Sequence, residues 1–158
     1  MSIHIRVATK EDYPALLPIA HETQDKHSEA LPHIFQNGTA GLPEDYFLKH
    51  LESKTKSVYI AEFENSIVGY VLLGLEQVSY IDILVPRNVA FISDIVVLKN
   101  YQGKGIGYQL FQACVAWAKS KGADSLDLMV WNFNKDAIAF YERQGMESLN
   151  RTMSLALR

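Results

Sequence analysis

The chain has 158 residues, of which 48% are hydrophobic and 21% are charged, and its formal net charge is −3 at pH 7. This balance indicates one globular domain over residues 1–158, and the mildly acidic charge argues against a nucleic-acid partner. The single cysteine, the lack of an apolar leader and the lack of a run of about 20 apolar residues predict a cytoplasmic protein with no disulfide and no membrane span.

The N-terminal part of the chain predicts a strand followed by a helix. Alternating apolar residues predict a strand at Ile3–Val7. The run Thr9-Lys10-Glu11-Asp12 resembles a capping box, so we expect a helix that continues to about Glu22. Pro18 should kink or break this helix. The next segment, Thr23–Leu42, is polar and contains proline and glycine, and we expect a long irregular connection there.

The remaining elements follow from periodicity, turn residues and glycine stops. We expect helices at Pro43–Lys54, at Gly105–Lys121 and from Asn134 to Gln144, and strands at Ser57–Phe63, Ile67–Leu75, Val89–Leu98, Ser125–Val130 and Met153–Leu157. Strands outnumber the helical crossovers in this order. The sheet should therefore be mixed, which excludes a purely parallel Rossmann sheet.

The segment Gln102-Gly103-Lys104-Gly105-Ile106-Gly107 joins a predicted strand to an amphipathic helix. Glycines permit positive φ, and the start of a helix offers free N–H groups and a dipole that favours an anion such as phosphate. A tight strand-to-helix turn without a ligand is the alternative. The Walker pattern fails because Ile106 follows Gly105, and the Rossmann pattern fails because the third glycine, Gly107, comes one residue early.

Three segments of the chain resemble the GNAT superfamily of N-acetyltransferases. The loop matches its [Q/R]-x-x-G-x-[G/A] signature. Asn134–Met146 is similar to its N-x-x-A-x-x-F-Y-x-x-x-G-F pattern and departs from it at Met146. Ile5–Asp12 is similar to its opening strand and helix start. The resemblance implies an α/β fold of the α+β type, with a mixed, mostly antiparallel sheet of about six to seven strands, splayed at strand 4 and flanked by about four helices.

The resemblance also implies a set of residues that bind the co-substrate, acetyl-CoA. Backbone amides of the loop would hold the pyrophosphate, and the backbone of the preceding strand would bind the pantetheine arm. The implied cofactor-binding residues are Ile95, Val96, Val97, Gln102, Gly103, Lys104, Gly105, Ile106, Gly107, Asn134 and Tyr141. Three alternatives to cofactor binding remain open. Ile95–Val97 could be an ordinary core strand, Lys104 could be a solvated loop residue, and Asn134 could only cap its helix.

Two residues are candidates for catalysis. Tyr141 matches the family's tyrosine that faces the thioester sulfur, where its phenol would donate a proton to the leaving thiolate; a tyrosine that only packs in the core is the alternative. Asp94 shares a strand face with Val96 and would orient an amine or accept its proton through water. Many relatives carry a glutamate on this strand, whereas this chain has Ser93 beside Asp94, so a carboxylate that only binds backbone at a bulge stays possible.

The acceptor side is indicated by a weaker match. His27, Pro32 and Phe35 fit an H-x-x-x-x-P-x-x-F pattern of some GNAT subgroups, and this resemblance implies that His27 and Phe35 lie on the acceptor side. We also expect Ser93, beside Asp94, to bind the acceptor. The five histidines have no metal-ligand spacing, so we expect no metal site.

The function implied by the resemblance is acetyl transfer from acetyl-CoA to a primary amine by direct attack in a ternary complex. The acceptor would be a small cationic metabolite or a protein or peptide amine. A non-catalytic acyl-CoA sensor with the same fold is the main alternative, and a phosphate-binding domain outside the family is a third. A homodimer is possible through pairing of Met153–Leu157.

Overall fold

The structure, a computed structural model, describes residues 2–76 and 81–158. The chain divides into two compact units, Met1–Leu128 and Met129–Arg158. Among these described residues, the first unit holds the sheet, three α-helices and two short 3₁₀ turns, and the second holds one helix. The expectation that residues 1–158 form a single domain stays a prediction.

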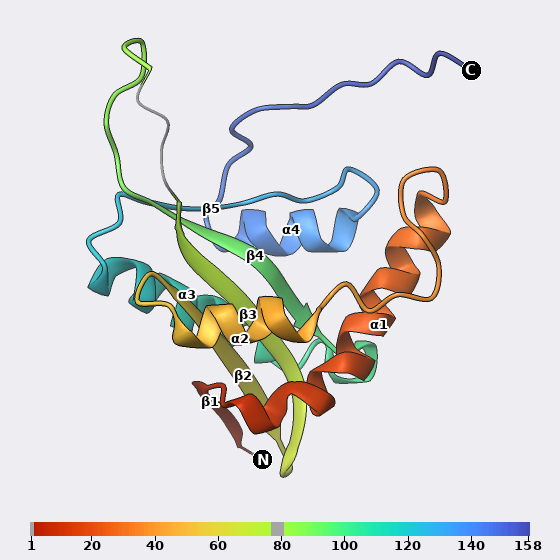
Figure 1. The fold of residues 1–158 in the computed structure, drawn as a ribbon, viewed down its shortest axis with the longest axis vertical. Coiled ribbons are helices and arrows are strands. Elements are labelled where there is room, and N and C mark those ends of the chain that lie inside the picture. The colour runs from red at the N-terminus through yellow and green to blue at the C-terminus, as the bar shows by residue number, and fades with distance from the viewer. Residues whose placement is uncertain (1, 77–80) are drawn as a thin grey trace. The chain divides into compact units, whose positions relative to one another are not determined.

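One mixed sheet organises the first unit (Figure 1). Its five strands lie in chain order, and they are β1 (Ile3–Val7), β2 (Lys56–Phe63), β3 (Ser66–Glu76), β4 (Val89–Val97) and β5 (Ser125–Leu128). The first three pairs are antiparallel and β4–β5 is parallel. The mixed, mostly antiparallel sheet is therefore confirmed, with five strands in place of the six to seven expected.

Helices cover both faces of this sheet. On one face, α1 (Tyr13–Ala30) and α2 (Glu44–Glu52) pack on alternate residues of the central strands, and this core includes Leu16, Ile19, Phe47, Val58, Ile60, Tyr70, Leu72 and Val96. On the other face lies α3 (Ile106–Ser120). A Cβ at Gly69 would lie 3.3 Å from the Leu110 side chain and 2.7 Å from the Val96 carbonyl oxygen. Glycine is therefore needed where α3 and β4 approach β3.

Helix α1 corrects two expectations from the sequence. It continues to Ala30, eight residues beyond Glu22, and Pro18 lies inside it without ending it. Pro18 has no N–H to donate to the Pro14 carbonyl, and this missing hydrogen bond lies in the first turns of the helix, which continues past it. The residues after it are mostly good helix formers, and the next glycine or proline is Pro32, which disfavours helix at the residue before it.

The second unit contains α4 (Lys135–Arg143). Its N-cap is Asn134, whose side-chain oxygen accepts a hydrogen bond from the Ala137 N–H at 3.4 Å. The expected strand at Met153–Leu157 is wrong, since the structure has no strand in residues 147–158. Alternating apolar residues form a strand only where a neighbouring strand completes their hydrogen bonds. A homodimer paired through this segment loses the strand on which that expectation depended.

Candidate functional site

The strand β4 changes partners at Ser93. Asp94 lies opposite Leu72 and Ile92 lies opposite Leu73, so Ser93 is an extra residue that forms a β-bulge. β5 pairs with Val89–Ile92 only. In the part of the chain that the structure describes, β4 beyond Ile92 is thus paired with β3 alone. This is the splay expected at the fourth strand, and within the described residues it leaves one edge of Ile95–Val97 without a neighbouring strand.

A loop with free backbone donors follows β4. Gly103 and Gly105 have φ angles of 78° and 85°, which favour glycine, and α3 begins at Ile106. Within the described residues, the consecutive N–H groups from Gly103 to Tyr108 donate to no acceptor. A Cβ at either glycine would meet no atom of residues 2–76 and 81–158 within 4 Å, so this part of the chain leaves the loop backbone open. Free N–H groups at a helix start form a site for an anion.

The side chains of this loop have structural contacts. Gln102 donates from Nε2 to the Val97 carbonyl at 3.0 Å, which ties the loop to the end of β4. The Lys104 ammonium lies 5.9 Å from the centroid of the Phe63 ring. Ile106 is buried under the first turn of α3. The backbone, more than these side chains, is therefore available for a ligand.

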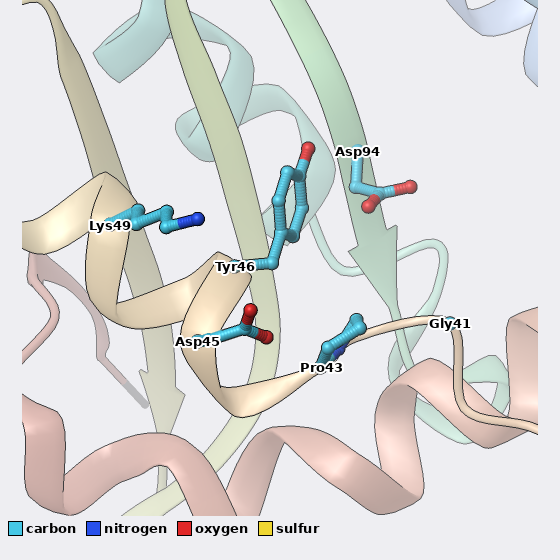
Figure 2. A pocket seen from close by; sticks show the side chains of 6 residues that line it. All are labelled: Gly41, Pro43, Asp45, Tyr46, Lys49 and Asp94. Atoms are coloured by element: carbon cyan, nitrogen blue, oxygen red, sulfur yellow. The ribbon is translucent and has the colours of Figure 1, made fainter.

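An open cavity of about 440 Å³ lies between α2 and β4. It is lined by Gly41, Pro43, Asp45, Tyr46, Lys49 and Asp94. Figure 2 shows Asp45, Tyr46 and Lys49 extending from α2, while Asp94 extends from β4 on the other side. The volume is that of a small-molecule site.

Asp94 is the most perturbed carboxylate of this cavity. Among the described residues it accepts no hydrogen bond and has no ion-pair partner. Burial raises the pKa of its carboxyl from 3.8 to about 6. The neighbouring Tyr70 is buried, and burial followed by the charge of Asp94 raises the pKa of its phenol. A carboxylate whose pKa lies near neutrality is suited to accept a proton.

A smaller cavity of about 190 Å³ shares Tyr46 as a wall. Its other lining residues are His50, Lys56, Gly74, Leu75, Glu76, Phe91 and Ser93. The buried His50 donates from Nδ1 to the Tyr46 carbonyl at 3.1 Å, and its ring meets the Tyr46 ring edge-on with centroids 4.6 Å apart. Burial lowers the pKa of His50. A neutral His50 therefore holds the Tyr46 ring in place between the two cavities.

The predicted acceptor residues lie in two places. His27 and Phe35 are in contact, with ring centroids 5.0 Å apart, but neither lines the two cavities described above. His27 lies on α1 and not in a loop as expected, and its Nδ1 donates to the Thr23 carbonyl at 2.9 Å. Ser93 lines the smaller cavity and Asp94 the larger one, so the bulge places two predicted residues in adjacent cavities.

Sequence reasoning missed the α2 side of the site. Tyr46 and His50 are four residues apart in α2, a spacing that predicts only a common helix face. Asp45 and Lys49 have the same spacing and line the larger cavity. No pattern in the sequence links them to Asp94, because α2 and β4 meet only through packing.

The two remaining predicted residues, Asn134 and Tyr141, belong to the second unit. Asn134 caps α4, and this cap is compatible with both interpretations of the residue; its contact with the co-substrate stays a prediction. Tyr141 accepts from the Met146 N–H through its carbonyl at 3.1 Å, and its ring lies 5.5 Å from that of Phe140. Its role as an acid stays a prediction.

Two further properties concern metals and membranes. In residues 2–76 and 81–158 the structure has no cluster of three or more potential metal ligands. None of the described helices is long and apolar enough to cross a membrane.

Comparisons with known proteins agree with this geometry. The model of the acetyltransferase (GNAT) family matches residues 20–146. The chain is 32% identical over 111 residues to an N-alpha-acetyltransferase of Saccharolobus solfataricus, over 65% of each chain. It is 32% identical over 102 residues to an uncharacterized N-acetyltransferase of Methanocaldococcus jannaschii, but the match spans only 44% of that relative's length and 65% of this chain.

Solved structures show the same fold. A mutant of the Bacillus halodurans protein BH1408 superposes with a TM-score of 0.93 at 28% identity, over 98% of this chain and 99% of that one. The aminoglycoside N-acetyltransferase AAC(6')-Iy in complex with CoA superposes with a TM-score of 0.69 at 19% identity, over 99% of this chain and 95% of that one.

Proposed function

Because this chain belongs to the acetyltransferase (GNAT) family, we propose that it transfers the acetyl group of acetyl-CoA to a primary amine. The observation that carries the proposal is the free edge of β4, which runs from the Asp94 cavity to the open N–H groups of the loop at Gly103. The loop would hold the pyrophosphate, and Ile95–Val97 would hold the pantetheine arm through their backbone. The thioester would then reach the bulge.

Acetyl-CoA supplies an activated acyl carbon when it is bound. The residues of the chain would bring the amine to it and manage its protons. An alkylammonium has a pKa near 10 and must lose a proton before its nitrogen attacks. Asp94 would accept that proton, because burial raises the pKa of its carboxyl to about 6, closer to neutrality than that of a solvated carboxyl. Tyr141 would donate a proton to the leaving thiolate, as the family resemblance implies.

The acceptor is an amine in several relatives. The Saccharolobus relative is named an N-alpha-acetyltransferase, and a mouse relative is named a thialysine N-epsilon-acetyltransferase. These names support an amine acceptor here. They do not agree on its position, since one name specifies an α-amine and the other an ε-amine. The charges of the cavity are therefore the better guide to the acceptor.

The proposal is tested by measuring thiol release from acetyl-CoA with a panel of amines. We expect amine-dependent release, and we expect kcat/KM to fall as the pH drops through about 6, where Asp94 becomes protonated. Asp94→Asn should lose about 100-fold in kcat and lose this pH dependence, while it retains acetyl-CoA binding. The matched control is Asp82→Asn, since Asp82 is exposed and lines neither cavity.

Three outcomes would contradict parts of the proposal. Acetyl-CoA binding without thiol release on any amine would favour the acyl-CoA sensor. No binding of acetyl-CoA would overturn the assignment of the loop. A Tyr141→Phe variant with unchanged kcat would remove Tyr141 as the acid, whereas slower release with unchanged acetyl-CoA affinity would support it.

A further inference from the structure

Three charged side chains of the larger cavity have no partner in the described chain. Asp45, Lys49 and Asp94 line it, and none of them makes an ion pair within 4.0 Å or a side-chain hydrogen bond. Asp45 and Lys49 are four residues apart in α2, the spacing at which opposite charges on a helix commonly pair. Both charges instead remain available to a ligand.

The arrangement of these charges is asymmetric. Asp45 and Lys49 stand one helical turn apart, a rise of about 5–6 Å, on one wall of the cavity. Asp94 stands alone on the opposite wall, on β4. The complement of this set is a ligand with an ammonium and a carboxylate close together at one end and a second ammonium at the other end.

We propose that the acceptor is a free basic amino acid that is acetylated on its side-chain amine. This inference rests on the proposed function. The α-ammonium binds Asp45, the α-carboxylate binds Lys49, and the side-chain ammonium reaches Asp94. At Asp94 the side-chain nitrogen gives up a proton, forms a C–N bond to the acetyl carbon and displaces the thiolate as the C–S bond breaks. Of the three protons of the ammonium, one stays on the amide nitrogen, one leaves through Asp94 to solvent, and one balances the proton that the thiolate takes up from its acid.

Other amine classes satisfy the cavity less completely. A diamine has no carboxylate and leaves Lys49 unpaired. A peptidyl lysine has neither a free α-ammonium nor a free α-carboxylate, so it leaves both charges of α2 unused. The cavity of about 440 Å³ accommodates a molecule of this size, and the ring of Tyr46 offers an apolar wall for its methylene chain.

The two charges of α2 also have a role that needs no ligand. Asp45 lies in the first turn of the helix and Lys49 in the last, where each interacts favourably with the helix dipole. That role affects the stability of α2 and acts equally on every acceptor. A ligand role changes the preference among acceptors, and the experiment measures this preference.

The experiment compares four acceptors for the purified enzyme with saturating acetyl-CoA. They are lysine, which has both α-groups, cadaverine, which lacks the carboxylate, 6-aminohexanoate, which lacks the α-amine, and Nα-acetyl-lysine amide, which mimics a peptide. Ornithine and 2,4-diaminobutyrate are compared with lysine to find the preferred side-chain length. We expect the best basic amino acid to exceed the other three by about 10- to 100-fold in kcat/KM, the value of one charge-assisted hydrogen bond. Mass spectrometry of the product should place the acetyl group on the side-chain nitrogen.

Two variants test the assignment of each charge. Lys49→Met should raise the KM for lysine about tenfold or more. The KM for cadaverine should not change, because cadaverine has no carboxylate that could bind Lys49. Asp45→Asn should raise KM for lysine and leave 6-aminohexanoate unchanged. Lys54→Met and Glu44→Gln are matched controls, since both residues are exposed and line neither cavity.

The results separate this inference from the proposed function. The inference would be overturned if cadaverine or the peptide mimic released thiol at the rate of lysine. It would also be overturned if the Lys49→Met and Asp45→Asn variants kept the wild-type preference among acceptors. Either result would leave the proposed acetyltransferase activity intact. Acetylation of the α-nitrogen would also overturn the inference. Failure of every amine to release thiol would instead overturn the proposed function.

Discussion

Asp94 imposes a cost on the folded protein that its proposed role explains. Burial raises the pKa of this carboxyl from 3.8 to about 6, so the folded state binds a proton more tightly than the unfolded chain. The free energy of unfolding therefore falls as pH rises from 3.8 to about 6, and the full penalty applies above that range. The difference between the two pKa values corresponds to roughly 3 kcal/mol at neutral pH.

We predict that Asp94→Asn stabilises the protein at pH 7.5 by roughly 1–3 kcal/mol, because the amide has no charge to desolvate. At pH 5 the gain should shrink to about half, since most of the folded protein then holds a neutral Asp94. Urea denaturation at the two pH values measures this difference. The exposed Asp82→Asn serves as control, and a destabilised Asp94→Asn at pH 7.5 would contradict the prediction.

Arg6 and Asp12 form the opposite case, in which a pair supports the fold. Arg6 donates from Nη1 and Nη2 to the two Asp12 oxygens at 2.9 Å each, and from Nε to Glu62 at 2.9 Å. Asp12 is only 8% exposed. The hydrogen bond from Arg6 holds the pKa of Asp12 below its usual 3.8. This stabilisation is therefore present above pH 3.8 and is lost as the pH falls below it.

We predict that Arg6→Met costs about 2–4 kcal/mol at pH 7, because it leaves a buried carboxylate without its cation. The loss should become smaller below about pH 4, where Asp12 becomes protonated in the unfolded chain. Urea denaturation against pH provides the measurement, and the exposed Lys10→Met is the control. A loss equal to that of Lys10→Met would show that the pair is only a surface ion pair.

At the scale of elements, the loop Gln102–Gly107 is separable from the packing of α3. Gly103 in the loop and Gly122 after the end of α3 have φ angles of 78° and 70°, and a Cβ at either would meet none of the described atoms within 4 Å. Alanine at each position should therefore cost a similar 1–2 kcal/mol of stability through backbone strain alone. The two positions differ only in their distance from the free N–H groups of the loop.

We predict that Gly103→Ala weakens CoA binding about tenfold or more, because the strained backbone turns the N–H groups away from the pyrophosphate. Gly122→Ala should bind CoA like the wild type. Isothermal titration calorimetry with CoA makes the comparison. Equal affinity losses in the two variants would mean that strain, and not the loop, controls binding.

The elements that the sequence predicted well are those whose cause is local. The loop Gln102–Gly107 was recognised because glycine positions, the strand before it and the helix after it are all adjacent in the chain. The polar composition of the segment after Glu22 predicts a loop, but the segment lacks glycine and proline until Pro32, and α1 extends through it to Ala30. The strand at Met153–Leu157 was wrong because its pattern says nothing about whether a neighbouring strand is present.

The cavity was predicted only in part because its walls are far apart in the sequence. Asp94 was found from its strand and from the family pattern, whereas Asp45 and Tyr46 come to face it only when α2 packs over the sheet. The bulge at Ser93 adds a second effect, because one extra residue reverses the faces of the strand on either side of it. Alternation counted back from Val96 therefore predicts the correct face for Asp94, whereas alternation counted forward from Ile92 across the bulge does not.

At the scale of the whole molecule, ligand binding should change stability by mass action. Acetyl-CoA that binds only the folded protein adds about 2.7 kcal/mol at 100 times its dissociation constant. For a chain of this size that amount corresponds to a rise in Tm of roughly 5–10 °C. The rise depends on affinity and not on turnover, so it distinguishes residues that hold the co-substrate from residues that act on the acceptor.

We predict that thermal unfolding with a fixed acetyl-CoA concentration separates two classes of variant. Asp94→Asn and Lys49→Met should keep the wild-type rise in Tm, because both side chains line the larger cavity, where we propose that the acceptor binds. Gly103→Ala should require about tenfold more acetyl-CoA for the same rise. An Asp94→Asn variant that loses as much of the rise as Gly103→Ala would place Asp94 in co-substrate binding, and the base would then have to be sought elsewhere in the cavity.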